Sequence, residues 1–200
     1  MSLTSEQKDL VVKLVQGGVQ TSTERLGKMS RTEWGVNFSG TQEISPVSLL
    51  SWFTHNQQNH LAVHFRSTSD VPLDILVLYS EESARSIVRA VTQPYEETLA
   101  PVQDLLPKMI GEVSNVLAQN VLAALSDFCR IVIILTVPEV KEGAKASLTA
   151  AAMEDYDGRK DILLLVHVQL HSERLNAECS MIVIINVAVM QSLLARADPV

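Results

Sequence analysis

The stretch GEVSNVLAQNVLAALSDFCRIVIILTVP, residues 111–138, decides most of the fold. Its first part belongs to an apolar stripe with steps of three and four residues, which predicts an amphipathic helix over residues 102–128. The run at residues 131–137 follows without polar alternation. It predicts a strand that is buried on both faces and ends before Pro138. The stripe consists of Leu106, Ile110, Val113, Leu117, Val121, Ala124 and Phe128.

A row of polar side chains lies on this helix away from the stripe. Glu112, Asn115 and Gln119 occupy positions i, i+3 and i+7, so they stand one above another on one helix face. The simplest interpretation is an ordinary solvated helix face. The alternative is a row of side chains that acts outward on a partner, because the core does not require an acid and two amides there.

Further helices and strands are predicted on either side of this stretch. A long apolar-periodic helix covers residues 5–29, with Ser5 as its cap, and the pair Gly17-Gly18 in it indicates close packing or a bend. Shorter helices are predicted at 45–53, 80–91, 145–153 and 189–197. Strands are predicted at 33–40, 60–66, 73–79, 161–168 and 179–187, the first of them ending at a turn.

The two halves of the chain have the same order of elements. LAVHFR at 61–66 corresponds to LLVHVQ at 164–169, and the segment at 73–90 corresponds to that at 180–197. We therefore predict an α/β (α+β) fold with a single domain of two pseudo-symmetric repeats, each of the α-β-β-β-α type. The repeats cover approximately 5–93 and 102–198 and share one sheet flanked by helices.

Composition narrows the class of protein. The chain has 200 residues, of which 46% are hydrophobic and 20% charged, as in a folded globular protein, and its net charge of -7 disfavours nucleic acids and anionic membranes as partners. The opening MSLTSEQKDL is too polar for a secretory signal, so we expect a cytoplasmic protein. Cys129 and Cys179 are expected to be buried free thiols. Trp34, Trp52 and Phe53 are interpreted as core residues, with a surface anchor as the alternative.

The helix also carries a recognisable motif. GEVSNVLAQNVLAALSDF resembles the signature helix of the CheC, CheX and FliY phosphatases of bacterial and archaeal chemotaxis. That family's pattern is Asp or Ser, three residues, Glu, two residues, Asn, twenty-two residues and Pro. Glu112, Asn115 and Pro138 fit this spacing, and Asn120 and the AALS run at 123–126 are similar to the family's helix. The resemblance implies a CheC-like fold, an α/β sheet with paired long helices.

One position departs from the family pattern. Lys108 stands where the family has Asp or Ser, one turn before Glu112. It forms an i,i+4 pair with Glu112 or competes for that carboxylate with a partner. We expect Lys108 and Gln119 to belong to the partner-binding surface around the signature pair.

The first long helix departs further. Alignment of the two long helices places Asp9, Lys13 and Gln16 at the positions of the family's leading acid, its Glu and its Asn. Gln16 keeps an amide, but Lys13 replaces the acid. We therefore expect a degenerate first site and at most one working site in the chain.

The resemblance implies a substrate and a mechanism. The substrate is a CheY-like response regulator phosphorylated on an aspartate, with Asn115 orienting the attacking water and Glu112 docking against the regulator's active-site lysine. The chain itself is expected to bind no cofactor, because the receiver domain supplies Mg²⁺. A non-catalytic binding module, as in relatives from the flagellar switch, is the alternative. A homodimer is possible in either case.

Two pairs of histidines could suggest a metal site. His60 and His64 lie on one face of a predicted strand, as do His167 and His171 on another. The repeat explains His64 and His167 as equivalent positions of the sheet, so we predict no metal.

Overall fold

Six strands form one sheet, and every neighbouring pair in it is antiparallel. The computed structural model describes residues 2–53, 58–69, 71–95, 102–158 and 160–197. The strands are β1 Gly35–Ile44, β2 Asn59–Arg66, β3 Leu73–Ser80, β4 Glu139–Ala144, β5 Leu163–Ser172 and β6 Ala177–Asn186. The helices are α1 Ser5–Ser30, α2 Pro46–Phe53, α3 Glu81–Thr92, η1 Gln93–Tyr95, α4 Val102–Cys129, α5 Lys145–Ala152 and α6 Val187–Arg196.

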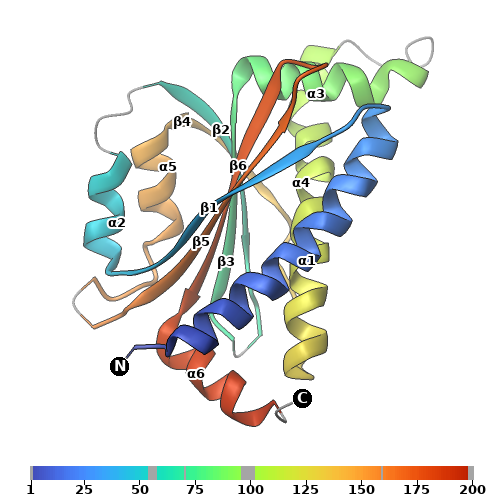
Figure 1. Ribbon diagram of the computed structural model, residues 1–200. Coiled ribbons are helices and arrows are strands. Elements are labelled where there is room, and N and C mark those ends of the chain that lie inside the picture. The colour runs from blue at the N-terminus through green and yellow to red at the C-terminus, as the bar shows by residue number, and fades with distance from the viewer. Residues whose placement is uncertain (1, 54–57, 70, 96–101, 159, 198–200) are drawn as a thin grey trace.

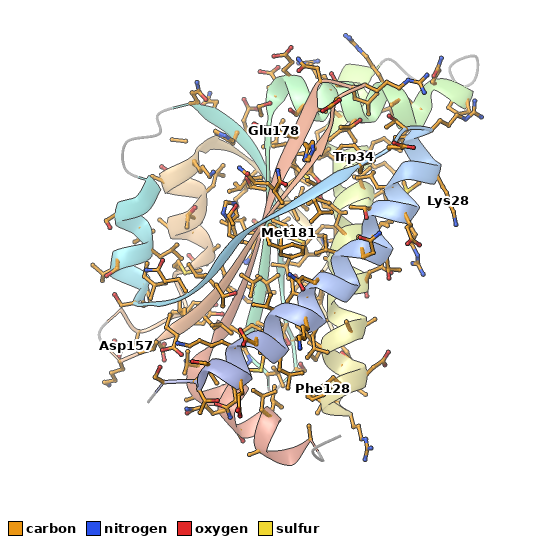
Figure 2. All side chains as sticks on the ribbon, in the orientation of Figure 1. Lys28, Trp34, Phe128, Asp157, Glu178 and Met181 are labelled. Atoms are coloured by element: carbon orange, nitrogen blue, oxygen red, sulfur yellow. The ribbon has the colours of Figure 1, made fainter. Side chains whose placement is uncertain are left out.

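Helices cover both faces of the sheet. Figure 1 shows α1 and α4 side by side on one face, α2 and α5 on the other, and α3 and α6 at opposite ends. The larger apolar core lies under α1 and α4, and a smaller one lies under α2 and α5. Met181 of the central strand β6 belongs to the larger core (Figure 2). The predicted single domain with one sheet flanked by helices is therefore confirmed.

The strand order has an internal symmetry. The order β1-β5-β6-β3-β2-β4 reads the same from the other end when β1, β2 and β3 are exchanged with β4, β5 and β6. The edge strands are exchanged between the halves, since β1 pairs with β5 and β4 pairs with β2. This order is what a duplicated unit produces, while the proposed bounds of the two repeats stay a prediction.

The run at residues 131–137 is not a buried strand, so that prediction is wrong. Val132 is 78% exposed, Ile134 58% and Val137 86%, and only Leu135 forms an isolated bridge, with Ser67. The place beside β2 is taken instead by the polar strand β4, which the sequence did not predict. By contrast, residues 182–185, the apolar part of β6, are buried on both faces of the sheet.

The ends of two other elements also differ from the prediction. The first strand does not end at a turn near Gly40. It continues to Ile44 through a bulge in which Gly40 has φ 117°, a conformation that glycine adopts without strain. Helix α1 is capped by Thr4 rather than Ser5, because Thr4 forms a capping box with Gln7.

The two long helices approach each other closely. A Cβ atom added at Gly18 would lie 2.5 Å from Val121 Cα, so only glycine fits at the crossing. Ser22 Oγ donates to the main-chain oxygen of Leu117 at 3.1 Å across the same crossing. The close packing predicted for the Gly17-Gly18 pair is therefore confirmed at Gly18. None of the helices in the described ranges combines the length and the apolar character needed to cross a bilayer.

Candidate functional site

The rotation of α4 about its axis decides which side chains face outward. Val113, Leu117 and Val121 are completely buried against the sheet and α1, as the stripe predicts. Glu112 is exposed, which confirms its predicted position. Asn115 is half-buried at the edge of the same face, so it is less exposed than predicted but lies outside the core.

The polar row is partly connected by a hydrogen bond. Gln119 Nε2 donates to Asn115 Oδ1 at 3.4 Å, near the long limit for such a bond. Lys108 is exposed, and no hydrogen bond or ion pair in the described part of the chain joins it to Glu112. The possible i,i+4 pair is thus not formed, and the Glu112 carboxylate faces solvent beside the Asn115 amide.

Pro138, the last residue of the motif, returns to the helix beside this pair. A Cβ atom added at Gly111 would lie 3.9 Å from Pro138 Cγ and 3.6 Å from Val140 Cγ2. The segment that follows α4 therefore packs against Gly111, directly before Glu112. The tertiary structure therefore places the proline, 23 positions after Asn115, near the turn of α4 that carries Glu112.

A buried hydrogen bond, which sequence reasoning missed, fixes the orientation of this helix. Ser114 and Tyr79 of β3 are both buried, and their hydroxyl oxygens lie 2.8 Å apart. Burial raises the pKa of Tyr79 well above its ordinary value, so its phenol remains neutral. The signal in the sequence was a serine inside the apolar face, a position that requires an internal partner. This bond holds the side of α4 opposite Glu112 against the sheet.

The ends of the two long helices support the alignment of their polar residues. Each helix is followed by an arginine with φ 52°, Arg31 after α1 and Arg130 after α4. Arg130 stands 99 positions after Arg31, as Asn115 does after Gln16. The matched ends place Gln16 in α1 where Asn115 stands in α4.

The polar residues of α1 form a different surface. Asp9 and Lys13 are exposed and Gln16 is half-buried. Lys13 stands where α4 has Glu112, so this face presents a cation beside its amide. The structure therefore presents two amides on equivalent helices but only one beside an acid.

The histidines are not gathered into one site. His64 Nε2 lies 2.6 Å from Asp74 Oδ1, and His60 Nδ1 lies 2.9 Å from the main-chain oxygen of Gln58. Buried nitrogens of His167 and His171 have no hydrogen-bond partner among the described residues. Burial, with a contribution from Lys145, lowers the pKa of His167. The described part of the chain contains no group of three or more His, Cys, Asp or Glu side chains that could hold a metal ion.

The cysteines and Trp34 are structural. Cys129 and Cys179 are buried and free, as predicted, and burial raises the pKa of Cys179 to about 12. Trp34 packs against the larger core, and its Nε1 donates to Ser30 Oγ at 3.0 Å. The side chains of Trp52 and Phe53 lie outside the described residues.

Comparisons with known proteins identify the fold. No model of a known protein family matches the sequence, and no curated protein matches it. Among solved structures, FliY from Thermotoga maritima matches with TM-score 0.76 and 14% identity over 98% of each chain. The FliM middle domain from H. pylori matches with TM-score 0.68 and 8% identity over 97% of this chain and 99% of that chain. The chemotaxis protein CheX from Desulfovibrio desulfuricans matches with TM-score 0.55 and 15% identity over 86% of this chain and 97% of that chain. The predicted CheC-like fold is confirmed.

Proposed function

We propose that this chain, which shares the CheC-like fold with FliY, CheX and FliM, is a signalling protein of chemotaxis or another two-component system. It dephosphorylates a CheY-like response regulator phosphorylated on aspartate. One observation carries the proposal: an exposed acid, Glu112, and an accessible amide, Asn115, lie together on one face of α4. Pro138, the last residue of the motif, lies near Gly111, directly before Glu112. The resemblance of this motif to that of the phosphatases supports hydrolysis of an aspartyl phosphate as the reaction at this surface.

Hydrolysis of an acyl phosphate requires little from the phosphatase itself. The oxygen of a water molecule attacks phosphorus in line, the aspartate carboxylate leaves, and inorganic phosphate is released. An amide both donates and accepts hydrogen bonds, so Asn115 is suited to orient this water. Glu112 forms a charge-assisted contact with the regulator's lysine and fixes the approach of the two proteins. The receiver domain would hold the Mg²⁺ ion and would thereby supply the positive charge for the phosphoryl oxygens.

The shape of the surface around Glu112 and Asn115 agrees with a reaction that takes place in a pocket of the receiver. Five of the hollows among the described residues are lined by other side chains, and neither Glu112 nor Asn115 contributes to them. An exposed acid beside a half-buried amide on a helix face fits a concave site on the partner. In the proposed complex the receiver therefore supplies the pocket, and α4 supplies the two side chains that enter it.

A binding module without hydrolysis is the second candidate. Lys108 in place of the family's Asp or Ser and the altered face of α1 both favour it. Structures with this fold include H. pylori FliM in complexes with FliG and with SpeE, so the fold also serves in protein assembly. Partner binding would then use the same face of α4.

The decisive experiment follows the loss of acyl phosphate from a cognate phosphorylated receiver at saturating concentrations of this protein. Asn115→Ala should lower the rate by roughly 10²-fold while binding survives, because only the position of the water is lost. Glu112→Ala should weaken binding by about tenfold or more, because a charge-assisted contact is lost.

Gln16→Ala is the matched control, since it removes the equivalent amide from α1 and should change neither quantity. An equal loss of rate in Gln16→Ala and Asn115→Ala would show that α1 is active as well. If the unaltered protein binds the receiver without accelerating hydrolysis, the binding module replaces the phosphatase as the function.

A further inference from the structure

A hollow of about 690 Å³ lies where the end of α1, the second half of α3 and the turn between β5 and β6 meet. Figure 1 shows these three elements converging at one end of the molecule. We call it the arginine hollow, because Arg31, Arg89 and Arg174 line it, one from each element, together with Ser30, Ser86 and Gln93.

The charge of this hollow is opposite to that of the whole protein. The net charge is -7, yet the described residues that line the hollow include three arginines and no acid, whereas the adjoining hollow that shares Arg31 and Arg174 also has Glu33 and Glu173. Arg174 Nη1 donates to the main-chain oxygen of Arg31 at 3.1 Å, and its guanidinium forms no other hydrogen bond with the described residues. In the described part of the chain, no ion pair with an acid engages Arg31, Arg89 or Arg174. Lys28 extends from the last turn of α1 at the same end (Figure 2).

A second hollow lies at the position related to the first by the internal symmetry of the fold. This hollow, also of about 690 Å³, lies where the end of α4, helix α6 and the segment between β2 and β3 meet. Apolar residues dominate its lining, among them Val71, Ile131, Val132, Val189 and Leu193. The fold thus forms a hollow at both positions, and among the described residues that line the two hollows, arginines occur only in the first.

We propose that the arginine hollow binds a phosphate dianion, either free phosphate or the phosphate group of a small phosphate ester. The planar guanidinium fork matches phosphate oxygens in pairs, and three such groups around one hollow favour a ligand with more than one negative charge. The serine hydroxyl of Ser86 adds a neutral donor from α3. The site is separate from Glu112 and Asn115, so it does not depend on the proposed phosphatase activity.

Calorimetric titration of the whole protein with inorganic phosphate at low ionic strength tests the site. Saturable binding is expected, and Arg89→Gln should weaken it by about tenfold. Arg85→Gln is the matched control, because Arg85 lies one turn earlier on α3, pairs with Glu81 and does not line the hollow. It changes the net charge equally and should leave binding unchanged. Equal weakening in both variants, or binding of acetate as tight as that of phosphate, would overturn the proposal.

A parallel titration with adenosine monophosphate distinguishes the two sources of the phosphate. Tighter binding of the nucleotide than of phosphate supports an ester as the ligand, and equal binding supports free phosphate. Arg31→Asn provides a second variant, since asparagine tolerates the left-handed conformation of this position, and it should also weaken binding about tenfold. Absence of binding by both ligands would exclude the site.

Discussion

At the scale of single residues, Glu43 ties the beginning of the chain to the end of β1. Its carboxylate accepts hydrogen bonds from the Ser2 hydroxyl and, at 2.7 Å, from the Leu3 main-chain N–H, and it lies 3.3 Å from Lys8 Nζ. Burial by itself raises the pKa of Glu43, but these partners outweigh it and hold the pKa below its ordinary value. The folded state therefore favours the ionised carboxylate.

Glu43→Gln should lower the free energy of unfolding at pH 7 by about 1 kcal/mol. A depressed pKa stabilises the fold above the ordinary value of 4.5, and this contribution is lost as the pH falls through the lower value of the folded state. The difference between variant and unaltered protein should thus shrink in urea unfolding below pH 4.5. Glu24→Gln, an exposed change on α1, should show no such pH dependence; a constant difference for Glu43→Gln would contradict the linkage.

At the scale of the helices, the contact between α1 and α4 depends on one of two adjacent glycines. Gly18 is buried against the backbone of α4, whereas a Cβ atom added at Gly17 would meet nothing within 4 Å. Both lie in the interior of α1, where glycine costs helix stability. The same substitution is therefore expected to have opposite effects at neighbouring positions.

Gly18→Ala should destabilise the protein by about 1–3 kcal/mol, because the added methyl group collides with the backbone at Val121 and the helices must separate. Gly17→Ala should stabilise it by about 0.4–1 kcal/mol, because it restricts only the unfolded chain. Chemical denaturation of both variants measures this. Similar effects of the two changes would mean that the helices are not in close contact at Gly18.

At the scale of the whole molecule, the two halves are interleaved rather than side by side. The edge strand β1 of the first half pairs with β5 of the second, and β4 of the second pairs with β2 of the first. The long helices α1 and α4 share one core across this exchange. Neither half contains the partners of its own first strand, so the chain should fold as one unit.

Separate fragments 1–95 and 102–200 should therefore show no cooperative unfolding transition, while the whole chain should unfold in a single one. Circular dichroism and tryptophan fluorescence should give coincident curves for the whole chain. Mixing the fragments is the control, and recovery of the cooperative transition in the mixture would show that both are competent to fold. A cooperative transition in either fragment alone would refute the interleaved unit.

The sequence by itself determined the helices, most strands, the single shared sheet and the outward face of α4. Periodicity is a local property, so the stripe through Val113, Leu117 and Val121 also fixed where Glu112 points. The spacing of the motif also identified Asn115 and Pro138 as candidate residues without the tertiary structure.

Only the tertiary structure decided which strands pair and which surfaces form. Residues 131–137 are apolar enough for a buried strand, but β4 occupies the edge of β2. The hydrophobicity of a segment does not predict which of two segments pairs with a given strand edge. The half-burial of Asn115 depends on its neighbours across space. The arginine hollow was equally hidden, because its three guanidinium groups come from segments far apart in the chain and meet only when the sheet brings their elements to one end.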